Sequence, residues 1–217
     1  MKQEEALNTL NDIRDLMEKS TKFLSLSGLS SIVVGLYACA GTLMAYHLLG
    51  TESLNYPTGD QPFLDINTPD KLISISLLAL GVLAASLLTV FLLSYRKCRR
   101  EGKAPFLTPA TKRLLWNFFL PLATGGIFCF SLLLHGYYGL TSSIMLLFYG
   151  LSLVNASKYT YSNTRYLGFA EIALGLIDSF VVNHALLFWV CGFGIFHIIY
   201  GIFFYLKIEQ HPTRTRN

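Results

Sequence analysis

Charged residues are scarce in this sequence. Of its 217 residues, 14% are Asp, Glu, Lys or Arg, while 53% are hydrophobic. Soluble globular domains carry about 25% charged residues, so the composition excludes an ordinary water-soluble domain. The surplus of apolar side chains needs a lipid bilayer, and the sequence therefore indicates an integral membrane protein.

Cysteine pairs and nucleotide-binding motifs are absent as well. The four cysteines are scattered and form no CxxC pair, which argues against a disulfide-stapled fold and against a zinc module. The sequence contains no Walker-type loop and no nucleic-acid-binding module. We therefore expect no direct nucleic-acid binding, although the formal net charge is +4.

Uncharged apolar runs recur along the chain. A transmembrane helix needs about 20 such residues, and six runs approach this length: 25–49, 72–95, 114–135, 139–157, 166–183 and 186–206. Unbroken runs exclude a porin-like barrel, whose short strands alternate in polarity. We predict an all-α, polytopic integral membrane protein with an amphipathic helix over residues 1–24, a six-helix transmembrane domain over 25–206 and a tail over 207–217.

The basic residues fall on one side of these six spans. They lie before the first span, between the second and third, between the fourth and fifth, and after the sixth; Lys71 is the exception among the 17. By the positive-inside rule, both termini face the cytoplasm. The amphipathic helix and the tail are then cytoplasmic segments.

The N-terminal segment has its own pattern. From Glu4 to Lys22, apolar residues recur at three- and four-residue spacing, which predicts one short amphipathic helix. Its polar face is not rich in Lys and Arg, unlike a typical binder of anionic lipid. The helix would lie against the cytoplasmic mouth of the bundle, or pair with a second copy or with a cytoplasmic regulatory protein.

Small residues recur seven residues apart in every span. The pairs are Gly28/Gly35, Ser74/Gly81, Cys129/Gly136, Ser143/Gly150, Gly168/Gly175 and Gly194/Gly201. Small residues let helices approach closely in lipid, so we expect this stripe to mark the inward face of each helix. An internal duplication of two three-helix halves would produce the pattern. Ordinary packing of apolar helices also produces it, and this simpler explanation is favoured.

Two acidic residues, Glu171 and Asp178, fall inside a span. An ionisable group at bilayer depth costs about 3 kcal/mol unless it finds a partner. Both lie on the small stripe of the fifth span, and His197 holds the position equivalent to Glu171 in the sixth. In an antiparallel hairpin that turns near His184, residues whose numbers sum to about 368 lie at one depth. Glu171 and His197 satisfy this condition.

The same arithmetic around the loop from Lys158 to Arg165, between the fourth and fifth spans, puts Ser152 at the depth of Glu171 and Asn155 at the depth of Gly168. The sequence therefore predicts a candidate ligand- or ion-binding cluster of Glu171, His197, Ser152 and Asn155, with Asp178 further outward. Such a cluster would relay a proton or cation or bind a small ligand. The alternative is a neutral, hydrogen-bonded pair that fixes helix register. No motif indicates a catalytic residue or an enzyme.

A second, weaker constellation lies at the external span ends. His47, His135 and His184 end the first, third and fifth spans, where they would converge on a metal ion or haem iron. No two of them share a helix at ligand spacing, and no CxxCH motif is present. A haem or metal cofactor is therefore the third alternative.

Several stretches of the second half form a distinctive pattern: FYGL (148–151), VNASKYT (154–160), RYLG (165–168), EI (171–172), LGL (174–176), GFG (192–194) and HIIYG (197–201), with FLSLSG (23–28) near the N-terminus. This pattern resembles a family of uncharacterised, Bacteroidetes-type six-span inner-membrane proteins. The resemblance implies a bacterial cytoplasmic (inner) membrane. Because such proteins are often encoded beside a winged-helix regulator, it also implies a signalling partner.

Three functions remain open at this point. The favoured one is handling of a small solute or ion, or ligand sensing, through the Glu171 and His197 cluster. Its rival is a membrane-anchored interaction or signalling protein that works with a cytoplasmic regulator through the N-terminal helix and the basic loop, the segment from Arg96 to Arg113 between the second and third spans. A haem- or metal-binding membrane protein is the third.

Overall fold

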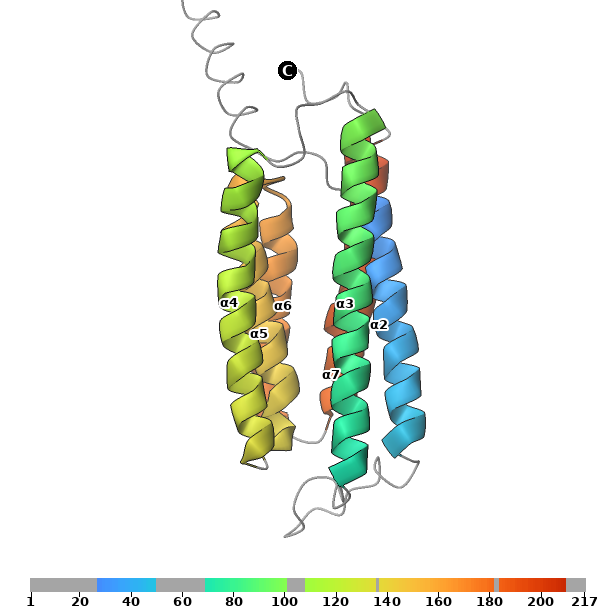
Figure 1. The fold of residues 1–217 in the computed structure, drawn as a ribbon, viewed down its shortest axis with the longest axis vertical. Coiled ribbons are helices and arrows are strands. Elements are labelled where there is room, and N and C mark those ends of the chain that lie inside the picture. The colour runs from blue at the N-terminus through green and yellow to red at the C-terminus, as the bar shows by residue number, and fades with distance from the viewer. Residues whose placement is uncertain (1–26, 50–68, 101–107, 136, 182–183, 210–217) are drawn as a thin grey trace, which may run out of the picture.

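The structure is a computed structural model that describes residues 27–49, 69–100, 108–135, 137–181 and 184–209. Within these ranges the chain is helical and contains no strand (Figure 1). Four helical segments are long and apolar enough to cross a membrane: Gly28–Leu48, Ile73–Arg100, Pro109–Leu134 and Ala185–Lys207. The all-α fold class is confirmed, and the four segments support a membrane protein.

Successive helices run antiparallel (Figure 1). The first five are α2 (Gly28–Leu49), α3 (Pro69–Arg100), α4 (Pro109–Leu134), α5 (Thr141–Ala156) and α6 (Thr164–Phe180). Short 3₁₀ turns, η2 (Tyr138–Leu140) and η3 (Ser157–Tyr159), flank α5. The last helical stretch, which we call the last crossing, consists of four consecutive segments. They are α7 (Ala185–Trp189), the π-helix η4 (Val190–Phe196), α8 (His197–Phe204) and the π-helix η5 (Tyr205–Glu209).

The start of α4 shows why charged residues are poor markers of helix ends. Thr108 is the N-cap, and its Oγ1 accepts a hydrogen bond from the Thr111 N–H at 3.2 Å. Pro109 follows at the first helical position, where the missing N–H costs nothing. The helix therefore begins at Pro109 rather than at residue 114, and includes Lys112 and Arg113.

The helices pack in two groups of three (Figure 1). α5 lies between α4 and α6, while α2 packs on α3 and on the last crossing, η4 and α8. The two groups meet where α5 and α6 face α7 and η4. The first span thus packs beside the last one, so the grouping does not follow two consecutive halves of the chain.

Glycines of the seven-residue stripe lie where helices cross. A Cβ at Gly150 would lie 2.7 Å from the Gly168 carbonyl oxygen, and a Cβ at Gly168 would lie 2.8 Å from that of Gly150. Gly28 and Gly201 oppose each other in the same way, at 2.6 and 2.7 Å. The predicted inward face is correct in α2, α5, α6 and the last crossing, where both small residues of each pair are buried.

The same prediction is wrong for α3. Ser74 and Gly81 are both exposed, and no atom lies within 4 Å of a Cβ built at Gly81. α3 packs mainly on α2. Because most of its surface faces outward, small residues on that surface are not required by a helix crossing.

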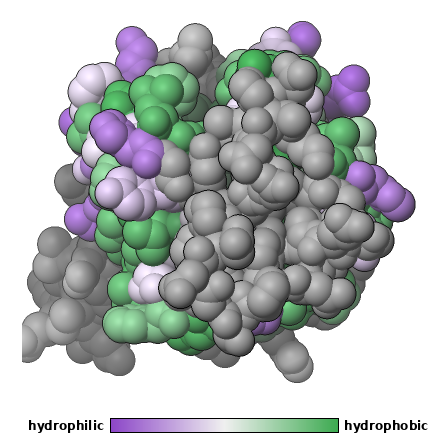
Figure 2. Space-filling view, turned by 90° about the horizontal axis from the view of Figure 1, so that it is seen from below, coloured by the Kyte–Doolittle hydropathy of each residue, from purple (hydrophilic) through white to green (hydrophobic). Residues whose placement is uncertain are grey.

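Large hydrophobic side chains cover the outside of the bundle. Leu77 is 63% exposed, Ile127 72% and Phe180 84%, and hydrophobic residues surround much of the bundle in an end-on view (Figure 2). A surface of this kind would aggregate in water but suits contact with lipid. The outside of the bundle therefore supports the membrane-protein class.

The two ends of the bundle differ in charge. α3 ends and α4 begins at one end, where α5 also meets α6 (Figure 1). We call it the basic end, because its connections and helix termini carry Arg96, Lys97, Arg99, Arg100, Lys112, Arg113, Lys158, Arg165 and Lys207. The opposite end, the histidine end, carries His47, His135 and His184. The predicted N-terminal helix, residues 101–107 of the loop between α3 and α4, and residues 210–217 of the tail lie outside the described residues.

Candidate functional site

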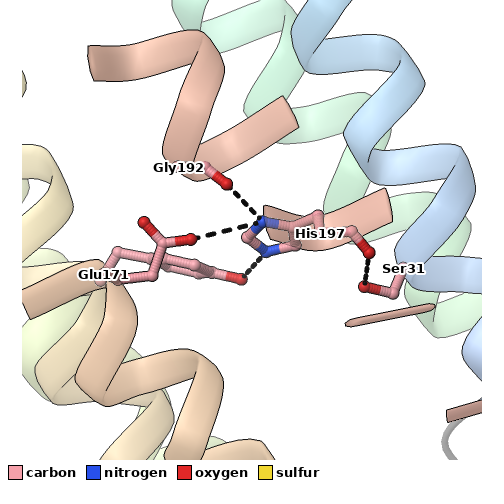
Figure 3. Close-up of polar contacts among 5 residues, drawn as sticks. Ser31, Glu171, Gly192 and His197 are labelled. Atoms are coloured by element: carbon pink, nitrogen blue, oxygen red, sulfur yellow. Dashed lines mark hydrogen bonds and ion pairs between the residues drawn. The ribbon is translucent and has the colours of Figure 1, made fainter. Parts of the chain in front are cut away.

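Glu171 and His197 lie together at the junction of the two helix groups. Glu171 is in the middle of α6 and 0% exposed, and His197 begins α8 and is 3% exposed. The Nδ1 atom of His197 lies 3.5 Å from Oε1 of Glu171 (Figure 3). The two residues, which we call the central pair, thus lie level with each other, as the depth arithmetic predicts.

The imidazole of His197 has a polar partner at each nitrogen. Nδ1 lies 3.1 Å from the Gly192 carbonyl oxygen, and Nε2 lies 2.6 Å from the Tyr149 hydroxyl oxygen. A carbonyl oxygen only accepts, so Nδ1 carries a hydrogen and donates it to Gly192. Nε2 then accepts from the Tyr149 hydroxyl when the ring is neutral, and donates to it when the ring is charged.

The Gly192 carbonyl that bonds His197 lies within the π-helix η4. π-helical hydrogen bonds join residues five apart, and π turns are frequent at functional sites. His197 lies five residues after Gly192, and its side chain reaches this carbonyl. A Cβ at Gly192 would lie 2.5 Å from Oε2 of Glu171. Glycine therefore leaves the space that the carboxylate occupies.

Glu171 itself accepts no hydrogen bond from any residue that the structure describes. Both of its carboxylate oxygens are buried, and neither has a hydrogen-bond partner in the described part of the chain. The 3.5 Å separation from Nδ1 of His197 is too long for a well-formed hydrogen bond. An ionised carboxylate in this position is costly unless it takes up a proton or a cation.

Aromatic rings and a serine complete the surroundings of His197. The ring centroids of Tyr149 and Phe193 lie 5.3 and 6.3 Å from that of the imidazole. The Ser31 hydroxyl donates to the His197 carbonyl oxygen at 2.9 Å (Figure 3). Helices α2, α5 and α6 thus all contribute to the site, together with the last crossing.

Asp178 belongs to a different cluster. It lies two turns beyond Glu171 on α6, toward the histidine end, and is 3% exposed. Its Oδ2 accepts hydrogen bonds from the hydroxyls of Ser142 and, at 3.0 Å, of Ser143. Both serines lie in the first turn of α5, where the helix dipole favours a negative charge. We call these three residues the serine–aspartate cluster.

Ser152 and Asn155 do not bond to the central pair. Ser152 is fully buried, but its hydroxyl donates to the Phe148 carbonyl oxygen of its own helix at 2.8 Å. Such bonds to the preceding turn are common for helical serine, and depth arithmetic cannot reveal them. Asn155 is half-buried and, within the described ranges, makes no hydrogen bond with Glu171 or His197.

Sequence reasoning missed Tyr149 and Ser142. Tyr149 lies near the middle of the fourth predicted span, far from interfacial water, and a phenol at that depth needs a hydrogen-bond partner. Ser142 and Ser143 lie near the start of the same predicted span, within a turn of the depth of Asp178. Both positions stand out in the sequence, but their partners can be identified only when it is known which helices pack against each other.

The three histidines of the histidine end form no three-ligand metal group in the described structure. His47, His135 and His184 are exposed, and Nδ1 of His135 donates to the Ser131 carbonyl oxygen of its own helix at 2.7 Å. Among the residues that the structure describes, no group of three or more His, Cys, Asp or Glu could hold a metal ion. A metal site with three or more such ligands is thus not found in those ranges.

Comparisons of the chain with protein-family models, with curated proteins and with solved structures find no match. The function is therefore argued from the geometry of the site.

Proposed function

We propose that this protein is a six-span protein of the bacterial inner membrane, with both termini in the cytoplasm, which binds a proton or a small cation at Glu171 and His197. The observation that carries the proposal is a fully buried carboxylate that has no hydrogen-bond partner among the described residues and lies 3.5 Å from a buried imidazole. Binding at this pair serves ion handling or sensing.

The six-span topology is supported by the arrangement of the helices. α5 and α6 have 16 and 17 residues, which corresponds to a length of about 25 Å. The 3₁₀ turns η2 and η3 extend α5 toward the hydrocarbon thickness of about 30 Å. With α5 and α6 as spans, every basic residue of the basic end lies on one side of the membrane, as the positive-inside rule requires.

The central pair can gain or lose one proton, and its net charge then changes by one. With Glu171 protonated and His197 neutral, the pair carries no net charge. Adding a proton gives an imidazolium, and removing one gives a carboxylate, so the two groups titrate as a unit. An ionisable pair at bilayer depth is a typical element of proton relays and of ion sites.

The packing around Glu171 favours a small ligand. A Cβ at Gly192 would contact Oε2 of Glu171 at 2.5 Å and would also collide with the Leu146 side chain. Leu146 is itself 0% exposed. The described residues thus enclose the carboxylate closely, which suits a proton or a bare cation better than an organic solute.

The test compares the full-length protein with Glu171→Gln, which keeps the shape of the side chain and removes its proton-binding group. Proton uptake is counted with a pH-indicator dye after a pH jump, and cation binding is measured by calorimetry with Na⁺ and K⁺. We expect the variant to lose the proton or cation bound at the pair. Ser152→Ala is the control, because Ser152 is equally buried but bonds its own helix.

Equal binding by wild type and Glu171→Gln, at equal helix content, contradicts the proposal. Ion flux into proteoliposomes then separates the two uses of the site. Flux that Glu171→Gln abolishes indicates transport, while binding without flux in the wild type indicates sensing.

A further inference from the structure

The central pair can hold one proton in two ways. In the first, Glu171 is a carboxylic acid and His197 is a neutral imidazole. In the second, the same proton gives a carboxylate beside an imidazolium. Neither form has a net charge, so a count of bound protons does not distinguish them. The hydrogen bonds around the imidazole do.

One ring nitrogen has the same role in both forms. Nδ1 of His197 lies 3.1 Å from the Gly192 carbonyl oxygen. This oxygen only accepts, so Nδ1 carries a hydrogen whether the ring is neutral or charged. The two forms therefore differ at Nε2, which lies 2.6 Å from the hydroxyl oxygen of Tyr149.

The Tyr149 hydroxyl fits the neutral ring. When Nε2 carries no hydrogen, the phenol donates to it, and each polar hydrogen of the two side chains has an acceptor. When Nε2 is protonated, the phenol oxygen must accept, and its own hydrogen then has no acceptor, because this hydroxyl makes no second hydrogen bond within the described ranges. An unpaired donor is costly in a buried site. The hydrogen bonds thus favour a neutral His197.

The distance between the two members of the pair also favours the neutral form. Hydrogen bonds from a charged N–H to a carboxylate are about 2.7–2.9 Å long, whereas Nδ1 of His197 lies 3.5 Å from Oε1 of Glu171. The Nδ1 hydrogen bonds the closer Gly192 carbonyl oxygen instead. An ionised Glu171 would therefore receive no well-formed hydrogen bond from the ring, while a carboxylic acid has no charge that needs one.

The surroundings of the carboxyl oxygens favour a proton over a metal cation. Oε1 of Glu171 faces the Nδ1–H group of His197, whose hydrogen carries positive charge and repels a cation. Oε2 is packed against Gly192, where a Cβ would lie 2.5 Å from it, and the buried Leu146 side chain lies against the same glycine. Hard cations take about six oxygen ligands, whereas a proton needs only one.

We infer that the ligand of the central pair is a proton held by Glu171 as a carboxylic acid, and that Tyr149 is a positioning residue that keeps His197 neutral by donating to Nε2. This inference rests on the proposed function and names its ligand and the group that holds it. Release transfers the proton to water: the O–H bond of Glu171 breaks, its electron pair stays on the carboxylate, and the imidazole keeps its single hydrogen.

Few ionisable groups face His197 from the elements packed against it. Tyr149 on α5 and Glu171 on α6 are the two that approach the ring within the described ranges. α2 contributes the Ser31 hydroxyl, which bonds the His197 carbonyl oxygen rather than the ring, and Cys39, whose Sγ lies against Gly194. Nε2 thus has the phenol of Tyr149 as its polar partner.

Tyr200 provides a matched control for Tyr149. It lies one turn after His197 in α8, and its hydroxyl oxygen lies 3.1 Å from Oγ1 of Thr164. Tyr200→Phe therefore removes a hydrogen-bonded phenol of the same helix group without removing a partner of the imidazole.

Two spectroscopic measurements on the full-length protein in lipid bilayers at neutral pH test the inference. Solid-state NMR of ¹⁵N-histidine-labelled protein reads the protonation of each ring nitrogen, and His197→Gln identifies the signals of His197. Infrared difference spectra between wild type and Glu171→Gln show the C=O stretch of a protonated Glu171. We expect a protonated Nδ1, an unprotonated Nε2 and the acid band of Glu171, all unchanged when Na⁺ or K⁺ is added.

The wild type alone can overturn the inference, so the test does not depend on the folding of the tyrosine variants. A doubly protonated His197 ring overturns it, as does the absence of the Glu171 acid band. Loss of that band when Na⁺ or K⁺ is added at constant pH also overturns it, because the ligand is then a metal cation.

Tyr149→Phe tests the positioning role. The variant removes a hydrogen bond that only the neutral ring receives. In an acid titration followed by NMR, we expect about tenfold less acid to give the doubly protonated ring, the equivalent of one hydrogen bond. For Tyr200→Phe we expect a value within about twofold of wild type. A purely structural role of Tyr149 leaves the titration of the ring unchanged, and that result overturns its positioning role.

These outcomes are separate from those of the proposed function. If Glu171→Gln binds as many protons and cations as wild type, the proposed function fails, while the NMR signals of His197 still decide whether Tyr149 keeps the ring neutral. If Glu171→Gln loses the bound proton but the wild-type ring is an imidazolium beside a carboxylate, the site stands and the assignment of the proton to Glu171 is wrong.

Discussion

Glu171 and Asp178 lie seven residues apart on the same face of α6, and both are buried, yet their surroundings are opposite. Asp178 receives two serine hydroxyls from the first turn of α5. Glu171 has no hydrogen-bond partner for either oxygen within the described ranges and faces an imidazole at 3.5 Å. One oxygen of the Asp178 carboxylate accepts two hydrogen bonds, whereas neither oxygen of Glu171 accepts one from a described residue.

The difference separates two roles that the sequence pattern cannot separate. A carboxylate that accepts hydrogen bonds from a neighbouring helix stabilises helix packing. A buried carboxylate without partners destabilises the fold unless a proton or cation joins it. We therefore assign the structural role to Asp178 and the binding role to Glu171, and the following predictions test that contrast.

The largest effect is expected from removing both serine hydroxyls, in the double variant Ser142→Ala and Ser143→Ala. Asp178 then stays buried without donors, which costs about 3 kcal/mol of unfolding free energy. Unfolding in mixed detergent and SDS micelles, followed by circular dichroism, measures the loss. Stability equal to wild type would show that these hydroxyls do not hold Asp178.

The carboxylates themselves give the next largest contrast. Asp178→Asn weakens two charge-assisted hydrogen bonds, and we expect a loss of about 2 kcal/mol. Glu171→Gln replaces a side chain that has no hydrogen-bond partner within the described ranges, so we expect a change of less than about 0.5 kcal/mol. The same unfolding assay compares the two variants side by side. A larger loss for Glu171→Gln than for Asp178→Asn would reverse the assigned roles.

Tyr149→Phe tests the hydrogen bond that the central pair makes through Nε2 of His197. The variant removes the partner of His197 Nε2 and keeps the ring that packs on Phe193. We expect a loss of about 1 kcal/mol and a shift of the His197 ring ¹⁵N signals. Tyr137→Phe is the control, because Tyr137 is 61% exposed. Unchanged His197 signals would mean that the two groups are not bonded.

Ser152→Ala gives the smallest expected effect. Its hydroxyl bonds the preceding turn of its own helix, and removing such a bond changes the unfolding free energy by less than about 0.5 kcal/mol. Proton and cation binding should stay at the wild-type level. Loss of binding in this variant would place Ser152 in the site after all, as depth alone suggests.

Much of the central pair could be predicted because hairpin depth is simple arithmetic. Two antiparallel helices joined by a short turn match residues by a constant sum, which selected Glu171 and His197. The same sum does not tell in which direction around the helix axis a side chain points. It therefore placed Ser152 at the depth of Glu171 without showing that the Ser152 hydroxyl bonds the Phe148 carbonyl oxygen of its own helix. It also cannot show that Tyr149 reaches the imidazole from α5.

The glycine stripe shows a similar limit. It predicts the inward face where a helix is crossed closely, as at Gly150 and Gly168, because only a missing Cβ permits that approach. On α3 the same spacing occurs by chance, since apolar helices are rich in small residues. Which helices lie at the periphery depends on the packing of the entire bundle, and no single span contains that information.

The π-helix η4 makes the fold sensitive to the number of residues in the last crossing. A π turn accommodates one residue more than an α turn, so it changes the rotational phase of everything that follows it by about 100° per inserted residue. His197 and Gly201 both lie after η4 and need this phase to reach Glu171 and Gly28. Deleting one residue between Val190 and Phe196 would restore a regular α-helix and turn both away from their partners at once.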